Sequence, residues 1–333
     1  MNKKHLKSAR IENYSTNNLK LGKIPVLKKH QYFIIEGYTI TGDAPKEFIR
    51  AYEYGTVRKR DWKNWPLFIA KTGHKWYPSE SITEYLLNKL GCAFNMNMSE
   101  SKIVFAGNQI RFLSKYFLNN DEELIHGAEL YAGYLGDKDF VEEIENKDLA
   151  RDFFTLQFTQ DAIKYAYPYH YEGIMEEFIK MILFDALVGN NDRHFYNWGI
   201  IRHLERDHAP RFAPIYDTAR GLFWNSSDDK ISRKFRNKNE LDLYIKKYAE
   251  RSKPKIGWEG ENNINHFNLV YNIHKHEFGI SKSDIYDLFL QKRFNRLIEV
   301  VNRDFVELFS KQRRELITRC LNYRYRRIIE LIG

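Results

Sequence analysis

A polar segment near the middle of the chain carries residue types and spacings that suit phosphoryl transfer. It contains Asp192, and Asn197 follows five residues later. A second carboxylate, Asp217, lies twenty residues beyond Asn197. Phosphoryl transfer needs a carboxylate that orients and deprotonates the attacking hydroxyl, and amide and carboxylate oxygens that hold Mg²⁺ against the phosphates. The sequence therefore predicts Asp192 as a catalytic base and Asn197 and Asp217 as magnesium ligands.

The elements expected around this segment would bring the three residues together. A long apolar helix is expected over 172–188, and it leads into the polar loop. Short strands are expected at 198–202 and 212–216, and this hairpin would place the two magnesium ligands beside each other. Within the loop, His194 would act in catalysis as an orienting group, and metal binding is its other interpretation. An ordinary Asx-rich turn after a helix is the alternative for the loop itself.

The first part of the chain supplies two further charged residues in the order that this chemistry requires. An expected strand over 66–71 ends in Lys71, and Glu84 follows thirteen residues later on a helix expected from about Ser79. Protein kinases pair a strand lysine, which binds the phosphates, with a helix glutamate. The alternatives are a surface lysine and a glutamate that forms a capping box with Ser81.

Hydrophobic periodicity divides the chain into a small strand-rich part and a large helical part. We expect an extension over 1–30, strands and one helix over 31–118, and mainly helices over 119–333. A hairpin is expected within 101–113, and the tail over 281–332 is expected to be helical throughout. The predicted fold class is α+β, with two lobes and a cleft between them.

Composition limits the class of protein. The 333 residues include 53 Lys and Arg against 44 Asp and Glu, for a formal net charge of +9. This mild basic excess favours anionic partners such as nucleotides, nucleic acid or acidic protein surfaces, but an ordinary soluble surface explains it equally well. Only two cysteines occur, which argues against a disulfide framework and favours a reducing cytoplasm. No run of about 18 apolar residues is present, so we expect no membrane span.

The central segment resembles the signature of the HipA-like serine/threonine kinases. The similarity rests on 192–199, with the sequence DRHFYNWG, and on 213–217, with the sequence APIYD. It is strong over 172–224 and weaker but continuous back to about residue 37. The resemblance implies a protein-kinase-like fold that uses ATP and Mg²⁺ to phosphorylate a protein substrate. Several members are toxins that phosphorylate an aminoacyl-tRNA synthetase and are held in check by a small DNA-binding antitoxin.

The resemblance also assigns a phosphate loop and a site of autophosphorylation. The corresponding loop places Gly42 four residues before Lys46. Because this loop offers a single glycine, the basic segment 55–60 stays open as an alternative. In some family members a hydroxyl of this loop is autophosphorylated. By position that residue would be Thr39 here, with Thr41 as the second choice, and the modification would lower ATP affinity.

Three further segments have an interpretation. Residues 111–117 resemble the hinge between the lobes, where the backbone of Lys115 and Tyr116 would meet the edge of the adenine, although a plain strand and loop fits equally well. The stretch 218–238 corresponds to an activation segment. The basic turn 253–258 would either receive substrate or pack against the fold.

The C-terminal part of the chain is strongly basic. We expect a solvated helix face, and a surface that binds nucleic acid or an acidic partner stays open as the second interpretation. The basic residues of this run are Lys311, Arg313, Arg314, Arg319, Arg324, Arg326 and Arg327.

Other functions stay open at this point. Similar DRHxxN spelling occurs in phosphoinositide kinases, so a lipid or small-molecule alcohol is an alternative acceptor. A non-catalytic interaction protein with a degenerate kinase fold is a third hypothesis, and the intact catalytic residues argue against it. HipA-like toxins often carry an additional N-terminal subdomain, whereas only about 30 residues precede the first expected strand, which argues against the usual antitoxin docking mode.

Overall fold

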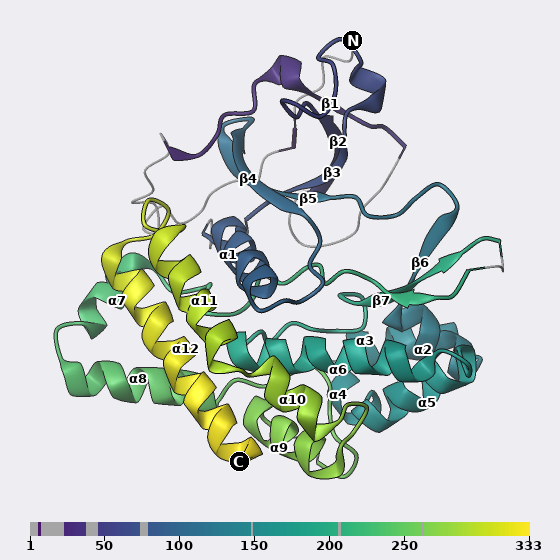
Figure 1. Ribbon diagram of the computed structural model, residues 1–333, viewed down its shortest axis with the longest axis vertical. Coiled ribbons are helices and arrows are strands. Elements are labelled where there is room, and N and C mark those ends of the chain that lie inside the picture. Colours follow the sequence, from purple (N-terminus) through teal and green to yellow (C-terminus); the bar gives the residue numbers. More distant parts are fainter. Residues whose placement is uncertain are drawn as a thin grey trace.

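The computed structural model places the chain in two lobes (Figure 1). It describes residues 6–7, 23–37, 46–73, 79–147, 149–205, 208–261 and 263–333. The smaller lobe is built on a five-stranded antiparallel sheet, and the larger lobe is mainly helical. The predicted α+β fold with two lobes is therefore confirmed.

The sheet of the smaller lobe has the strand order β1-β2-β3-β5-β4. The elements of this lobe are η2 (Lys29–Gln31), β1 (Tyr32–Ile34), β2 (Lys46–Ala51), η3 (Trp62–Asn64), β3 (Leu67–Thr72), α1 (Glu80–Ala93), β4 (Ser101–Ala106) and β5 (Gln109–Lys115). The hairpin expected between β4 and β5 is present. Its turn residues Gly107 and Asn108 have φ values of 57° and 60°, the left-handed backbone of a two-residue hairpin.

Helix α1 begins near the expected residue but without the expected cap. Its N-cap is Ser79, so Ser81 lies inside the first turn and the predicted capping box with Glu84 is wrong. Gly91, a residue type that often ends a helix, lies inside α1, which continues for two more residues. The reason for a glycine there is packing, since a Cβ would come within 2.3 Å of Met98 Sδ.

The larger lobe contains a second, three-stranded sheet and the remaining helices. Its elements are β6 (Glu122–His126), α2 (Gly127–Leu135), α3 (Lys138–Asn146), α4 (Ala150–Phe153), α5 (Leu156–Ala166), α6 (Tyr171–Val188), β7 (Gly199–His203), β8 (Arg211–Phe212), α7 (Asp228–Lys234), α8 (Lys238–Glu250), α9 (His266–His276), α10 (Lys282–Leu288), α11 (Gln291–Arg303) and α12 (Lys311–Ile332). The tail, expected to be helical throughout, consists of α10, α11 and α12 with short non-helical breaks at 289–290 and 304–310. Hydroxyl caps mark such breaks: Thr155 caps α5 and Ser310 caps α12.

The hairpin of β7 and β8 forms as predicted, but β8 is shorter than expected. Ile200 pairs with Phe212, and the chain then leaves the sheet. Ile215 instead forms a parallel bridge with Met98, which lies in the connection between α1 and β4. The segment that leads to Asp217 is thus attached to the smaller lobe.

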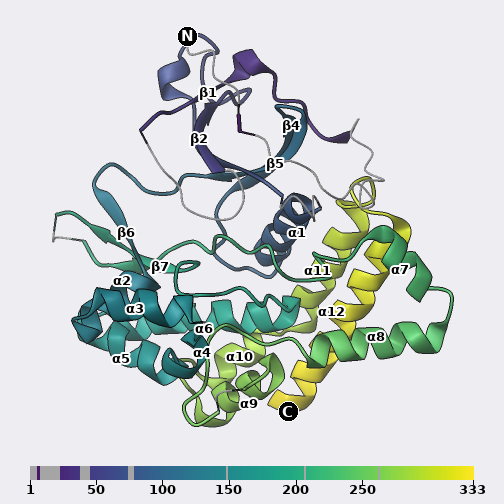
Figure 2. The same cartoon turned by 180° about the vertical axis from the view of Figure 1, so that it is seen from behind.

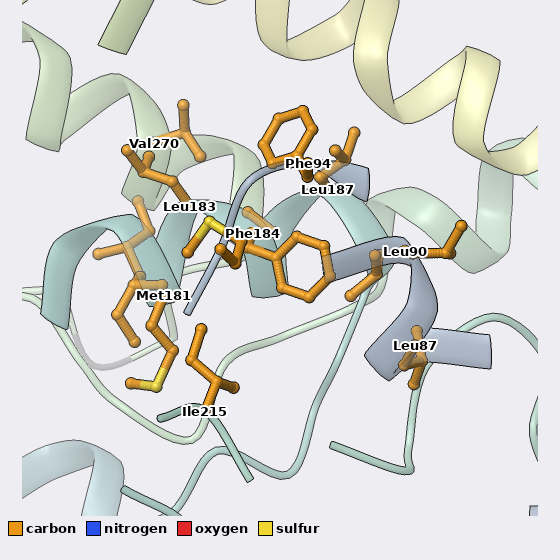
Figure 3. Packing of buried hydrophobic residues seen from close by; sticks show 14 of the residues in the cluster. Leu87, Leu90, Phe94, Met181, Leu183, Phe184, Leu187, Ile215 and Val270 are labelled. Atoms are coloured by element: carbon orange, nitrogen blue, oxygen red, sulfur yellow. The ribbon is translucent and has the colours of Figure 1, made fainter. Parts of the chain in front are cut away.

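One hydrophobic core joins the two lobes. Figure 3 shows side chains of α1 interleaved with side chains of α6, together with Ile215 and Val270. The ring centroid of Phe94, which directly follows α1, lies 6.1 Å from that of Phe184 of α6. Since α6 leads directly into the polar loop, this packing fixes α1 relative to that loop.

Helix α12 runs beside α7 and α8 and also contacts α6, α9 and α11 (Figure 2). Its expected solvated basic face is only partly present. Arg313 and Arg324 are 2% and 0% exposed, so two of the seven basic residues point into the fold. No helix in the described part of the chain is both long and apolar enough to span a membrane.

Candidate active site

A cluster of opposite charges joins the two lobes at the inner face of the larger sheet. Lys71 Nζ on β3 lies 2.8 Å from Glu84 Oε1 on α1 and 2.7 Å from Asp217 Oδ1. Burial would lower the pKa of Lys71, but Asp217 and Glu84 outweigh it and raise that pKa above its ordinary value. Burial also raises the pKa of Glu84, and Lys71 offsets this only in part. The lysine is therefore charged at neutral pH and held by two carboxylates.

Lys46 adds a second cation to this cluster. It stands directly opposite Lys71 in the β2–β3 register, so both side chains leave the same face of the sheet. Its Nζ lies 3.3 Å from Asp217 Oδ2. Burial would raise the pKa of Asp217, but Lys71 and Lys46 hold it below its ordinary value. Asp217 also adopts a left-handed backbone with φ of 53°, a conformation that tertiary contacts must maintain.

The polar loop after α6 presents Asp192 beside this cluster. Helix α6 ends at Gly189, whose φ of 67° turns the chain out of the helix. Asp192 has a side chain that is 20% exposed, and Arg220 Nε lies 3.3 Å from its Oδ2. Burial raises the pKa of Asp192, and Arg220 and then His194 partly offset this effect. A carboxylate in this position can accept a proton from a hydroxyl that enters the cleft.

A buried ion pair supports the loop from below. Arg193 Nε lies 2.7 Å from Asp185 Oδ2, with the two side chains 1% and 2% exposed. The same guanidinium donates hydrogen bonds to the carbonyl oxygens of Asn197 (2.7 Å) and Tyr216 (2.8 Å) and to Thr218 Oγ1 (2.6 Å). Arg193 therefore connects the loop to Tyr216 and Thr218, the residues on either side of the predicted metal ligand Asp217.

Sequence reasoning missed this ion pair and the Arg220 contact. One signal was available, because Asp185 is an acidic residue within the otherwise apolar last eight residues of α6, 181–188. A carboxylate in such a place needs a buried partner. Nothing in the sequence pattern identifies Arg193 as that partner, or brings Arg220 to Asp192 across 28 residues.

His194 lies in the loop as predicted, close to Asp192. Its Nδ1 accepts a hydrogen bond from the Tyr196 N–H (3.3 Å), which leaves Nε2 to carry the proton of the neutral ring. Burial lowers its pKa, and Asp192 and Asp217 oppose this only in part. Among the described residues, no three His, Cys, Asp or Glu side chains gather as metal ligands.

Asn197 and Asp217 have the donor atoms for Mg²⁺. The Asn197 Nδ2 donates to the Asp192 carbonyl oxygen (2.7 Å), so Oδ1 is the atom of this amide that a cation can use. Asp217 keeps 28% of its side chain exposed. One amide oxygen and one carboxylate are few ligands, but Mg²⁺ normally completes its shell with phosphate oxygens and waters. The two residues therefore fit a magnesium ion that arrives with a nucleotide.

A pocket of about 710 Å³ continues along the same face of the sheet. Leu67 is four residues before Lys71 on β3 and so faces the same side, and Phe48 of β2 pairs with Ile69 on that side. Tyr116, just after β5, packs edge-on against Phe48 with centroids 5.6 Å apart. The pocket is lined by Phe33, Ile34, Ile35, Glu36, Phe48, Arg50, Trp62, Lys63, Leu67, Tyr116, Asn119, Asn120 and Glu122. Aromatic and aliphatic walls of this kind suit a planar base.

The expected hinge residue Lys115, whose predicted contact with the adenine is through its backbone, directs its side chain to the other face of the sheet. Lys115 pairs with Phe68, whose side chain lies on the opposite face from Lys71, and its Nζ contacts Glu100 at 2.6 Å. The Lys115 side chain therefore points away from the cleft. Thr39, Thr41 and Gly42 lie outside the described residues.

The alternative phosphate loop, 55–60, lies between β2 and β3 at the far end of both strands. The register pairs Lys46 with Lys71 at one end and Arg50 with Leu67 at the other, and this segment follows the second end. It is mostly exposed. Its position therefore argues against a role at the charge cluster.

The basic turn 253–258 follows Ser252, whose Oγ donates to the carbonyl oxygen of Gly189 at the end of α6 (3.4 Å). Trp258 stacks on His276 and packs edge-on against Phe278, with centroids 5.7 and 5.3 Å apart. Of the two interpretations, packing therefore describes the tryptophan. Lys255 acts electrostatically on both Asp192 and His194, so the turn also adds positive charge to the site.

Comparison with known proteins agrees with this geometry. The family model described as HipA-like C-terminal domain matches residues 39–268. The chain belongs to this family. A search of curated proteins found no significant match.

Solved structures show the same fold in the HipA-like family and in a related kinase. CtkA, a proinflammatory kinase of Helicobacter pylori, superposes with a TM-score of 0.68 at 18% identity, over 92% of this chain and 97% of CtkA. HipA of Shewanella oneidensis MR-1, in a complex with HipB and operator DNA, gives a TM-score of 0.50 at 14% identity. That match covers 88% of this chain and 65% of HipA. At these identities the likeness concerns the fold, which is kinase-like.

Proposed function

We propose that this HipA-like chain is a Mg-ATP-dependent kinase that phosphorylates serine or threonine in a protein. The observation that carries the proposal is the bridge from Lys71 to Glu84 and Asp217, at 2.8 and 2.7 Å. This bridge unites a strand lysine, a helix glutamate and a metal-binding carboxylate from three separate segments. Kinases need these groups in place together before they transfer a phosphoryl group.

The roles follow from the contacts of each side chain. Lys71 and Lys46 bind the phosphates, and Glu84 holds Lys71 in position. Asn197 and Asp217 hold Mg²⁺, which neutralises the developing charge on the phosphates. Three other residues act outside this charge cluster. Asp192 orients and deprotonates the acceptor hydroxyl, and His194 orients the loop. Tyr116 contributes to the pocket for the nucleotide base.

The charge cluster also bears on the other hypotheses. A degenerate, non-catalytic kinase fold has no need for a buried Lys71–Glu84 pair, since burying two charges is costly. A lipid or small-molecule acceptor would use the same catalytic residues, so only the labelled product distinguishes it. We favour a protein acceptor because of the family resemblance. By the same resemblance, the substrate would be a translation component such as an aminoacyl-tRNA synthetase.

A small DNA-binding, antitoxin-like partner belongs to the same proposal, because the HipA structure contains HipB and operator DNA. The toxin or regulatory role would then depend on that partner. Direct binding of nucleic acid by the basic helix α12 is less favoured, since Arg313 and Arg324 are buried. Autophosphorylation at Thr39 or Thr41 remains a prediction, which mass spectrometry after incubation with Mg-ATP would check.

The test compares wild type with Asp192→Asn in cell lysate supplied with radioactive ATP. We expect labelled protein with wild type and a loss of about 100-fold or more with the variant, because the base contributes that much to proton transfer. Nucleotide binding should persist in Asp192→Asn and weaken in Asp217→Ala. Label in lipid rather than protein would support the alternative acceptor, and absence of both labelling and nucleotide binding would refute a kinase.

A further inference from the structure

Helix α12 sends a buried arginine to the segment that follows Asp217. The Arg313 side chain is 2% exposed, and its Nε donates to Asp228 Oδ1 at 2.7 Å. Nη1 donates to the carbonyl oxygen of Phe223 (3.4 Å), and Nη2 to that of Ser226. One guanidinium thus contacts three positions between Phe223 and α7.

This segment has a backbone that does not hold its shape by local preference. Leu222 and Phe223 are consecutive non-glycine residues with φ of 47° and 63°. Left-handed backbone at bulky residues is strained, and it persists only where surrounding contacts impose it. Helix α8 supplies some of those contacts: Tyr248 Oη accepts the Phe223 N–H (2.8 Å) and its ring stacks on Phe223 at 3.9 Å. Arg313 supplies the contacts from α12.

A short series of contacts connects the same segment to Asp192, the proposed catalytic base. Gly221 lies so close to α6 that a Cβ would be 2.8 Å from the Val188 carbonyl oxygen. The Asn191 N–H donates to the Arg220 carbonyl oxygen (3.2 Å), and Arg220 Nε lies 3.3 Å from Asp192 Oδ2. A shift of the segment would therefore move Arg220 relative to Asp192.

We propose that Arg313 is a positioning residue that clamps residues 221–228 and thereby sets Arg220 beside Asp192. This inference rests on the proposed kinase function for its effect on catalysis. Kinase activation loops are commonly ordered by phosphorylation, through new pairs between arginine and the phosphate. Here the unmodified carboxylate of Asp228 occupies the place of that phosphate. Arg313 lies outside residues 39–268, which the family model matches, whereas the segment that it contacts lies within them.

The test uses the full chain with Arg313→Met and Arg313→Lys, and Arg326→Met as the matched control. Arg326 is an exposed arginine of the same helix, so its variant removes the same charge without touching the segment. Amide hydrogen exchange over 221–228 measures the clamp directly. Steady-state kinetics with Mg-ATP and nucleotide affinity measure its effect on the reaction.

For Arg313→Met we expect exchange over 221–228 to rise at least about 10-fold while most of the fold keeps its protection. We expect kcat to fall about 10- to 100-fold, because a displaced catalytic group loses orientation. The nucleotide dissociation constant of Arg313→Met should stay within about twofold of the wild-type value, since neither the lining of the pocket for the nucleotide base nor the ion pairs of Lys71 include residues 221–228. A general loss of folding would instead change both quantities together. Arg313→Lys should recover part of kcat, because its single point charge can keep only the Asp228 pair.

Asp228→Asn serves as the second variant if Arg313→Met does not fold. It should raise exchange over the same residues and lower kcat in the same direction, by a smaller factor. The clamp is refuted if Arg313→Lys and Asp228→Asn both match Arg326→Met in exchange and in kcat. If wild type transfers no phosphate, the proposed function fails, and the exchange measurement still decides whether Arg313 orders the segment.

Discussion

Two ion clusters of the active site differ in what they leave for a ligand. In the Lys71–Glu84–Asp217 cluster, the carboxylate of Asp217 keeps 28% of its surface exposed and faces a second lysine. In the Asp185–Arg193 cluster both side chains are at most 2% exposed, and the guanidinium donates only to protein acceptors. The first cluster can exchange a protein partner for a phosphate or a metal, whereas the second can only hold the loop. Buried charge at an active site therefore serves two separate purposes, chemistry and support.

Breaking the supporting pair should have the largest effect on stability. Arg193→Met leaves Asp185 buried without its partner and removes three hydrogen bonds to backbone and hydroxyl acceptors. We expect the free energy of unfolding to fall by about 3–5 kcal/mol. Urea denaturation monitored by circular dichroism would measure it, with Arg326→Met as control. Adding Asp185→Leu should recover part of the loss, and an unchanged urea midpoint in Arg193→Met would show that the pair is not a support.

Breaking the chemical cluster should cost less stability and more activity. Lys71→Met leaves Lys46 beside Asp217, and Glu84 can take up a proton because its pKa is already raised. We expect a loss of about 1–2 kcal/mol in the free energy of unfolding. Phosphoryl transfer should fall by about 100-fold or more, since a charge aimed at the phosphates is lost. If Lys71→Met unfolds as easily as Arg193→Met, the two clusters are structurally equivalent.

The smallest effect concerns pH. The pKa of Asp217 is held below its ordinary value, so its stabilising contribution is complete above about pH 4, the ordinary value of an aspartate. That contribution is lost as the pH falls through the lower folded-state pKa. The contribution of Lys71, whose pKa is raised, is complete below its ordinary value of about 10.4 and is lost only as the pH rises through the higher folded-state value.

Urea denaturation of wild type and Asp217→Asn between neutral and acidic pH tests this behaviour. The difference in unfolding free energy should be constant from about pH 5 to 8 and shrink below about pH 4. A difference that stays constant to the lowest pH at which both proteins fold would mean that Asp217 is not held as an ion.

Local sequence accounts for a large part of the site. Asp192 and Asn197 share one short loop, so the chain itself keeps them close. Lys71 lies near the end of β3 and Glu84 lies near the start of α1, and this order predicts that the two side chains meet. Element ends were less predictable: Ser79 rather than Ser81 occupies the N-cap position of α1, and its side chain forms no cap hydrogen bond.

The sequence by itself determined the two-lobed fold class, and it was enough to predict Asp192 as the base, the two metal ligands and the pairing of Lys71 with Glu84, since each prediction depends on residue type and short spacing. Only the tertiary structure decided which charge meets which. Arg313 reaches Asp228 across 85 residues, and Arg324 turns inward from a helix whose pattern suggested a solvated face. Periodicity shows which side of a helix is apolar, but a long arginine can enter the core wherever packing leaves carbonyl and carboxylate oxygens to accept its hydrogen bonds.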